Sequence, residues 1–304
     1  MTGLLSLVIT LEYMGKEPSR PPNWFGRAAQ DYLLTALGDA YTAEIANDLH
    51  RGSERRPYTV STLYGASFRK KYLQPGARYD LRFTAFRDDL LIIMHNAIQP
   101  ANLLGIGTIA ELVNQPFMVT DQAWLNETNQ WAESTTYEQL WQAYTQVEER
   151  MPETLTAAIA SPAYFRNSEE NQVVFLPDPV VFFTDLINKW QAFAPERLLL
   201  PADLVETIAS NVFPSDANLR SSSVYVRGVY HIGMKGTVTY ACSRKINPFH
   251  WGLCHMLVHF AKFCGIGAET TIGFGQCQPQ FSTGENQRSN IQPLYARRSR
   301  TAAR

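Results

Sequence analysis

Two pairs of closely spaced glycines late in the chain are the first residues with an evident chemical use. Gly265 and Gly267 flank an isoleucine, and five residues separate them from Gly273 and Gly275, which flank a phenylalanine. Clustered glycines accept positive φ and can present backbone N–H groups to an anion such as phosphate. The nucleotide fingerprints do not fit, because Thr270 stands where a dinucleotide motif needs glycine and no Gly-Lys-Ser/Thr follows. A tight connection between a helix and a strand is the alternative interpretation.

Four residues of the types that bind zinc lie just before this loop. They are Cys254, His255, His259 and Cys264. His255 and His259 would share one helix face, as zinc ligands do, but the glutamate of a His-Glu-x-x-His motif is missing. Satisfied histidines in an apolar helix are therefore favoured, and a metal-dependent hydrolase is the lesser alternative. We expect no metal and no other cofactor.

Charged side chains are segregated along the chain, although the formal net charge is only −1. Residues 51–87 carry nine basic side chains against two acidic ones, whereas residues 121–160 carry seven acidic ones against Arg150 alone. A basic segment of this kind is the electrostatic footprint of a nucleic-acid-binding surface. A solvated basic face without a ligand is the alternative.

Composition indicates a globular protein with room for two domains. The chain has 304 residues, of which 45% are apolar and 18% charged. The four cysteines form no Cys-x-x-Cys pair, which favours reduced thiols and a cytoplasmic location. Residues 1–13 have no basic leader and alternate as a strand does, and no window is long enough to span a membrane. We therefore expect a soluble protein without membrane contact.

The pattern of elements that would position these residues repeats once along the chain. In the first half we expect strands at residues 1–13, 58–61 and 79–85, a further strand within 107–119, and helices at 27–50 and from Asp88. In the second half we expect strands at 154–160, 224–230, 234–242 and 272–281, and helices opened by Asp178-Pro179 and Asn247-Pro248. Each half reads β-α-β-β-α-β, which is the ferredoxin-like unit.

The predicted fold class is therefore α+β, with two tandem ferredoxin-like (RRM-like) domains. Residues 1–125 form the first domain and residues 154–282 the second. Residues 126–153 are polar and acidic and are expected to be a linker with some helix around residues 137–149. Residues 283–304 are expected to be a disordered basic tail.

Several short stretches, in this order and spacing, resemble one family: the Cas-six group of CRISPR endoribonucleases, in the RAMP superfamily. The likeness covers most of residues 1–282. The stretches are Leu49-His50 with Arg56-Pro57-Tyr58-Thr59-Val60-Ser61, Ser161-Pro162-Ala163-Tyr164-Phe165-Arg166, Leu176-Pro177-Asp178-Pro179, and residues 265–276 with their glycines. None is specific alone, but together they are.

The resemblance implies metal-independent cutting of CRISPR transcripts within their repeats to produce guide RNAs. In that reaction the ribose 2′-OH attacks the adjacent phosphate and leaves a 2′,3′-cyclic phosphate and a 5′-OH. The step needs a base, a proton donor for the departing oxygen, and cations near the phosphorus. The implied partner is repeat RNA, single-stranded or hairpin, while a CRISPR interference complex and a homodimer stay open. The main alternative is a non-catalytic relative that binds repeat RNA.

The residues expected to carry the reaction follow from this resemblance. His50 is the expected acid or base, because an ordinary imidazole pKa of about 6.5 suits both roles. Arg56 is the expected charge stabiliser, with Arg51 and Arg55 as competitors, since arginine cannot act as a general acid. Tyr32 or Tyr41 could assist or could pack in an aromatic stripe. The expected RNA-binding residues are Gly265, Gly267, Gly273, Gly275, Arg55, Arg69, Lys70, Lys71, Arg244 and Lys245.

Overall fold

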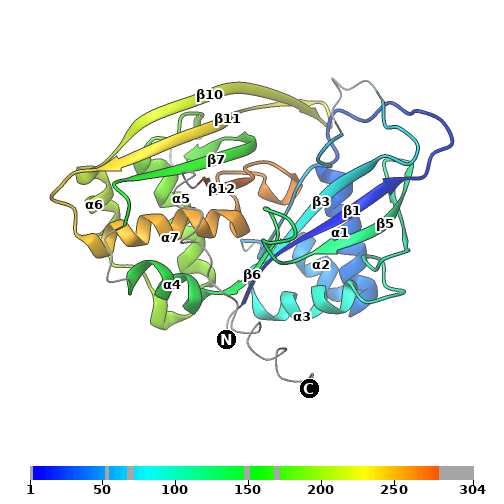
Figure 1. Cartoon of the computed structure of the whole chain (residues 1–304), viewed down its shortest axis with the longest axis horizontal. Coiled ribbons are helices and arrows are strands. Elements are labelled where there is room, and N and C mark those ends of the chain that lie inside the picture. The colour runs from blue at the N-terminus through cyan, green and yellow to red at the C-terminus, as the bar shows by residue number, and fades with distance from the viewer. Residues whose placement is uncertain (1–2, 52–54, 67–71, 147–150, 168–171, 281–304) are drawn as a thin grey trace, which may run out of the picture.

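The computed structural model describes residues 3–51, 55–66, 72–146, 151–167 and 172–280 (Figure 1). Within these residues the chain forms two lobes, each built on an antiparallel sheet, that lie side by side. The predicted tail at residues 283–304 lies outside the described residues. None of the described helices combines the length and the apolar character needed to cross a bilayer.

The N-terminal lobe is a sheet with helices packed against one face. Its strands are β1 (Gly3–Tyr13), β2 (Tyr58–Val60), β3 (Arg78–Ala85), β4 (Ile109–Leu112), β5 (Gln115–Ala123) and β6 (Glu133–Thr136). Its helices are α1 (Gly26–Ala40), α2 (Ala43–Arg51) and α3 (Asp88–Ala97). Leu7, Ile9 and Leu11 of β1 point into one core with Leu33 and Leu37 of α1. The alternation predicted for residues 1–13 places these side chains on the helix-covered face.

The C-terminal lobe repeats the plan with a longer hairpin. Its strands are β7 (Thr154–Ala163), β10 (Val212–Val226), β11 (Val229–Cys242) and β12 (Cys277–Gln280), with a small hairpin of β8 (Phe165–Asn167) and β9 (Gln172–Val174). Its helices are α5 (Pro179–Phe193), α6 (Leu204–Asn211) and α7 (Pro248–Cys264), with 3-10 turns η1 (Glu196–Leu198) and η2 (Thr270–Ile272). Asp178 and Asn247 cap α5 and α7 with their side chains, as predicted.

The order of strands confirms the predicted ferredoxin-like topology. The N-terminal sheet runs β2-β3-β1-β5, with β4 at the edge beyond β5, and the C-terminal sheet runs β10-β11-β7-β12. In both sheets the second and third strands of the unit lie on one side of the first strand, and the last strand lies on the other side. The repeated β-α-β-β-α-β order therefore folds twice into the same sheet.

One predicted turn is wrong. The strands expected at residues 224–230 and 234–242 place a turn between residues 230 and 234, but the turn lies at Arg227 and Gly228, whose φ values are 48° and 84°. Two successive positive φ values join adjacent strands in the turn type that hairpins favour. The long β10–β11 hairpin exposes most of β10, so its sequence lacks the apolar alternation that marks a half-buried strand.

The segment predicted to be a linker carries regular structure. β6 pairs with β1, and α4 (Tyr137–Thr145) begins with a capping box between Thr136 and Gln139. α4 packs closely on α7, because a Cβ atom at Gly252 would lie 2.2 Å from the Tyr144 carbonyl oxygen. Residues 133–145 therefore join the two lobes through buried contacts.

A buried arginine of the N-terminal sheet holds the end of α7. Arg82 is 0% exposed, and its Nη1 donates to the Lys262 carbonyl oxygen at 2.7 Å and to Ser6 Oγ at 3.3 Å. Its Nε donates to Gln276 Oε1 at 3.0 Å. The Thr84 hydroxyl donates to the Phe263 carbonyl oxygen at 2.7 Å. The last carbonyls of a helix lack partners within the helix, and here the other lobe supplies them.

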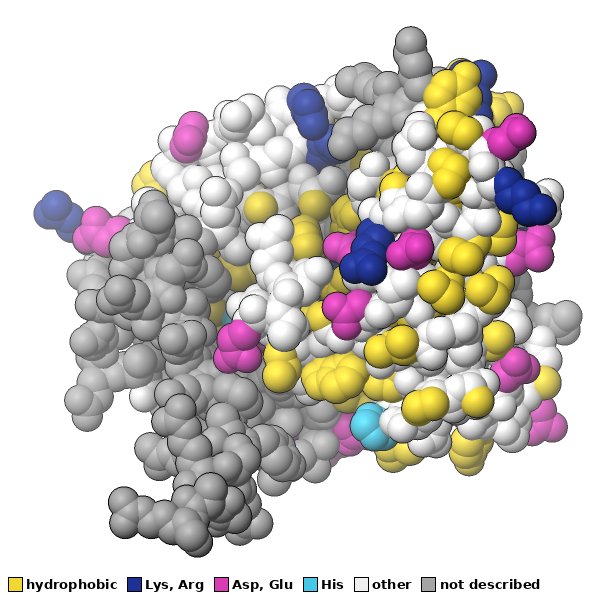
Figure 2. All heavy atoms as spheres, turned by 45° about the vertical axis from the view of Figure 1, so that its right-hand side comes forward, with side chains coloured by type: hydrophobic (Ala, Val, Ile, Leu, Met, Phe, Trp, Pro, Cys, Tyr) yellow, Lys and Arg dark blue, Asp and Glu magenta, His cyan; other side chains and the backbone are white. Residues whose placement is uncertain are grey.

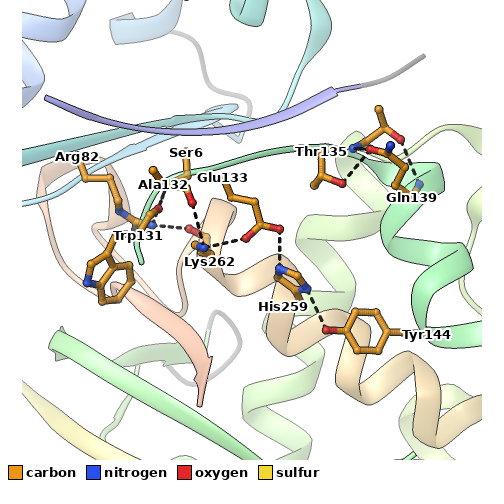
Figure 3. Close-up of polar contacts among 11 residues, drawn as sticks. Ser6, Arg82, Trp131, Ala132, Glu133, Thr135, Gln139, Tyr144, His259 and Lys262 are labelled. Atoms are coloured by element: carbon orange, nitrogen blue, oxygen red, sulfur yellow. Dashed lines mark hydrogen bonds and ion pairs between the residues drawn. The ribbon is translucent and has the colours of Figure 1, made fainter. Parts of the chain in front are cut away.

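A second polar network joins β6 to α7 and α4 (Figure 3). Glu133 accepts from Lys262 Nζ at 2.7 Å and from His259 Nε2 at 2.8 Å, and His259 Nδ1 lies 2.9 Å from the Tyr144 hydroxyl. Burial alone would raise the pKa of Glu133, but the charges and hydrogen bonds of His259 and Lys262 outweigh it and hold that pKa at about 2.

Replacing Arg82 should weaken the joint between the lobes. We expect Arg82→Met to lower the free energy of unfolding by about 3–5 kcal/mol, because buried acceptors lose a charged donor. Arg78→Met is the matched control on the same strand. Arg78 is exposed and pairs with Glu12 at the surface, so its loss should cost less than about 1 kcal/mol. Urea unfolding followed by circular dichroism measures both, and equal losses would contradict the assigned role.

Glu133→Gln should destabilise the protein in a pH-dependent way. The pKa of Glu133 is lowered from an ordinary 4.5 to about 2 on folding, so its carboxylate stabilises the fold above pH 4.5. This contribution is lost as the pH falls from 4.5 toward 2. The unfolding free energies of wild type and variant should therefore differ most near pH 7 and converge in acid. The exposed Glu127→Gln is the control, and a pH-independent difference would refute the prediction.

Candidate functional site

The glycine loop, residues 265–276, lies where the two lobes meet. All four predicted glycines have positive φ, with values of 64°, 67°, 96° and 63° in chain order. The Gly265 N–H donates to the Ala261 carbonyl oxygen at 2.9 Å and so ends α7. The Gly267 N–H donates to Asp185 Oδ2 at 2.8 Å, and the Gly275 N–H to the Pro162 carbonyl oxygen at 2.9 Å.

These hydrogen bonds change the interpretation of the loop. The N–H groups of Gly265, Gly267 and Gly275 each have a protein acceptor, so they do not form the row of bare donors expected for an anion. The glycines instead permit close approach of backbones. A Cβ at Gly267 would lie 2.2 Å from the Tyr164 carbonyl oxygen, and one at Gly275 would lie 1.9 Å from that of Ile266. The loop is a tight connection, and its contact with RNA stays a prediction.

The loop is also fastened to the N-terminal lobe. Trp24 Nε1 donates to the Ile272 carbonyl oxygen at 2.6 Å, and the rings of Trp24 and Phe274 lie 5.0 Å apart. A Cβ at Gly26, the first residue of α1, would lie 1.8 Å from the same Ile272 oxygen. Trp24 and Gly26 were not predicted as site residues, because nothing in their local pattern shows a partner 246 or more positions away.

The predicted catalytic histidine stands at the end of α2. His50 is the last residue but one of this helix, and its side chain, like that of Arg51, is outside the described atoms. Arg56 Nε donates to the Leu49 carbonyl oxygen at 3.0 Å. A guanidinium at a helix C-terminus satisfies a free carbonyl and favours the negative end of the helix dipole. The structure therefore brings Arg56 to the residue next to His50.

Two consecutive residues of α5 connect this helix end with the glycine loop. Arg55 donates through Nη1 to the Asn188 carbonyl oxygen. Lys189 Nζ donates to the carbonyl oxygens of Gly265 at 3.1 Å and Gly267 at 3.2 Å. The end of α2 and the glycine loop therefore lie on the same side of the molecule. Lys189 was not predicted as a site residue. Its spacing of four residues from Asp185, with which it pairs at 2.8 Å, is a local signal that could have indicated it.

Arg27, near the start of α1, is a further cation on this side. Gln30 Nε2 donates to the Tyr58 hydroxyl at 3.0 Å, and both Arg27 and Arg56 lie near that hydroxyl. Burial raises the pKa of Tyr58 although the two arginines oppose the shift. An open groove of about 560 Å³ runs along the outer side of α1. Its lining includes Trp24, Arg27, Asp31, Tyr32, Leu103, Ile109 and Glu111.

The remaining predicted residues make other contacts than with the end of α2 or the glycine loop, although Tyr32 lines the groove along α1. The Tyr32 hydroxyl donates to the Leu103 carbonyl oxygen, and burial raises the Tyr32 pKa far above its ordinary value. Tyr41 is 61% exposed. Arg244 and Lys245 lie in the turn before α7, at the opposite end of this 17-residue helix from Gly265. That separation is on the order of 25 Å at 1.5 Å per residue.

Arg69, Lys70 and Lys71 lie outside the described residues. On the face shown in Figure 2, the basic side chains among the described residues are scattered singly between acidic and hydrophobic ones.

The histidines considered as zinc ligands contact other groups. His259 contacts Glu133 and Tyr144, and His255 Nε2 lies 3.3 Å from the Pro152 carbonyl oxygen. Among the described residues, no three His, Cys, Asp or Glu side chains gather as metal ligands do.

Comparison with known proteins gives one family match over part of the chain and several structures of similar fold. Residues 158–277 match the family model of the CRISPR-associated endoribonuclease Cas6. A structure of a Cas6 product complex superposes with a TM-score of 0.70 at 22% identity, covering 92% of this chain and 100% of that one. Cas6 of Thermus thermophilus gives 0.66 at 23% identity, covering 92% and 99%. A Cas6-related protein of Pyrococcus furiosus gives 0.54 at 12% identity, covering 91% and 98%. No curated protein sequence matches significantly.

The fold is thus the tandem ferredoxin-like fold of Cas6 structures, as the sequence predicted. The family model covers residues 158–277, and the solved Cas6 structures share the fold over most of the chain at 23% identity or less. The matched residues contain the glycine loop, α5 and α7 but not α2. The assignment of His50 therefore stays a prediction.

Gly267→Ala should test the close packing of the loop. Both Gly267 and Gly76 have positive φ, of 67° and 72°, so alanine should cost about 1–2 kcal/mol of backbone strain at either position. Only at Gly267 would the new Cβ meet a backbone atom, whereas nothing lies within 4 Å at Gly76. We expect Gly267→Ala to lose about 1–3 kcal/mol more than Gly76→Ala in urea unfolding. Equal losses would show that the loop can relax.

Proposed function

We propose that this protein cuts CRISPR repeat RNA by metal-independent attack of a ribose 2′-OH on the adjacent phosphate. The products would carry a 2′,3′-cyclic phosphate and a 5′-OH. The observation that carries the proposal is the contact path from the end of α2 through Arg55, Asn188 and Lys189 to the glycine loop. This path supports a single site that draws on both lobes of the chain.

His50 is proposed as the general acid or base of this site. The C-terminal end of α2 favours the protonated imidazole by about 0.3–1 kcal/mol, which suits a donor to the departing 5′-oxygen. Arg56, held against the Leu49 carbonyl, is placed to stabilise the charge of the five-coordinate phosphorus. Arg55, which donates to the Asn188 carbonyl, remains a competitor. Arg51 remains a competitor on the same helix end.

Repeat RNA is the proposed partner. Two similar structures are described as a Cas6 product complex and a Cas6 substrate mimic complex, and a third as a RAMP protein binding different RNA substrates. The cations Arg27, Arg56 and Lys189 lie on the side where the lobes meet, which supports contact with a phosphate backbone there. An interference complex and a homodimer stay predictions.

A cleavage assay on a repeat RNA, with a metal chelator present, tests the chemistry. We expect wild-type protein to cut and His50→Ala to lose about 100-fold or more in rate while RNA affinity changes little. His95→Ala is the control, because His95 is exposed on α3, away from the proposed site. A 2′-deoxy nucleotide at the cut position should block the reaction.

Each alternative has its own outcome in this assay. Binding without cutting by wild-type protein would favour the non-catalytic relative. Cutting that stops when the chelator is added would favour a metal-dependent hydrolase. Cutting that persists at the 2′-deoxy position would refute attack by the 2′-OH.

A further inference from the structure

The N-terminal sheet carries a buried hydroxyl that the proposed site does not use. The Tyr64 hydroxyl is shielded from solvent and has no hydrogen-bond partner among the described residues. Leaving such a group unpaired costs about 1–3 kcal/mol. An unpaired buried polar atom in a folded protein therefore calls for an explanation, and a ligand is one.

Tyr64 borders a cavity of about 330 Å³. The cavity is lined by Val8, Tyr64, Asp80, Asn129, Gln130 and Trp131. Val8 pairs with Arg82, and Asp80 with Thr10, so the lining strand residues point to the face opposite the helices. On that face Arg82 is covered by the end of α7, and the cavity lies next to it. Its volume is at the lower end of the range for small-ligand sites.

The lining has the chemistry of a nucleobase site. The rings of Tyr64 and Trp131 are nearly parallel, at 18° and 6.0 Å between centroids, which provides flat apolar surface. Asp80 accepts from the Thr10 hydroxyl at 2.9 Å through Oδ1, and Oδ2 is a further acceptor. Asn129 and Gln130 add side-chain amides. A phosphate would be repelled by Asp80, whereas a base edge with N–H donors would be attracted.

We propose that this cavity binds one unpaired guanine base of the RNA. Guanine presents O6 as an acceptor beside the N1–H and N2–H donors. The two donors match the Asp80 carboxylate, and O6 matches the Tyr64 hydroxyl, which is shielded in the free protein and would have to become accessible as the base binds. Unpaired bases are the form in which proteins read RNA sequence through such edges. The ligand class rests on the proposed function, and the cavity would add a sequence preference that is independent of cutting.

Titration calorimetry of the full chain with nucleosides tests this without any cleavage step. We expect guanosine to bind more tightly than adenosine, uridine or inosine, because inosine lacks the N2 amino group. Asp80→Asn should weaken guanosine binding by about 10-fold, within the range of one bidentate base contact. Asp121→Asn is the control and should bind as wild type does, because Asp121 is an exposed carboxylate on β5, two strands from Asp80, and does not line the cavity.

Tyr64→Phe separates a ligand role from a structural one. We expect this variant to lose several-fold in guanosine affinity without a fall in its unfolding midpoint, since it removes an unpaired group. No guanosine binding at millimolar concentration, equal binding of adenosine, or binding unchanged in Asp80→Asn would each overturn the proposal. Because His50→Ala is expected to slow cutting without changing guanosine binding, guanosine binding and RNA cleavage can fail separately.

Discussion

The end of α7 depends on hydrogen bonds that the N-terminal lobe supplies. Arg82 brings a charge into the interior, where its desolvation costs several kcal/mol, and burial lowers its pKa. The cost is offset by the Lys262 carbonyl, Ser6 and Gln276, and by the Trp131 ring 4.7 Å away. Because the glycine loop follows α7 directly, this contact also sets where the loop meets the N-terminal lobe.

The geometry of the candidate site depends on this contact between Arg82 and the end of α7. Lys189 of α5 donates to two carbonyl oxygens of the glycine loop. Arg55 of the N-terminal lobe donates to the carbonyl oxygen of Asn188, the residue before Lys189. Neither lobe contains the whole constellation. The family match lies entirely within the C-terminal lobe, whereas His50 and Arg56 belong to the N-terminal lobe. A change in the relative position of the lobes would therefore separate the proposed acid or base from the loop without unfolding either sheet.

The fold could be predicted where local patterns determine it, as with the capped helices that begin after Asp178 and Asn247 and the alternating β1. Prediction failed where the determining partner is distant. The sequence counts Arg82 as part of a basic surface, yet it is fully buried by contacts 180 and 194 positions away. The sequence left two interpretations of the glycine loop open, because no local pattern reveals that Asp185 and Pro162 accept from its amides.

The central claim is that the end of α2 and the glycine loop contact one RNA strand across the joint between the lobes. The most direct measurement is a structure of the protein bound to a repeat RNA with a 2′-deoxy nucleotide at the cut position. We predict that the scissile phosphate lies within about 3 Å of the His50 imidazole or the Arg56 guanidinium, with the adjoining nucleotides along the glycine loop. A phosphate bound away from α2, with the RNA following another face, would contradict the account.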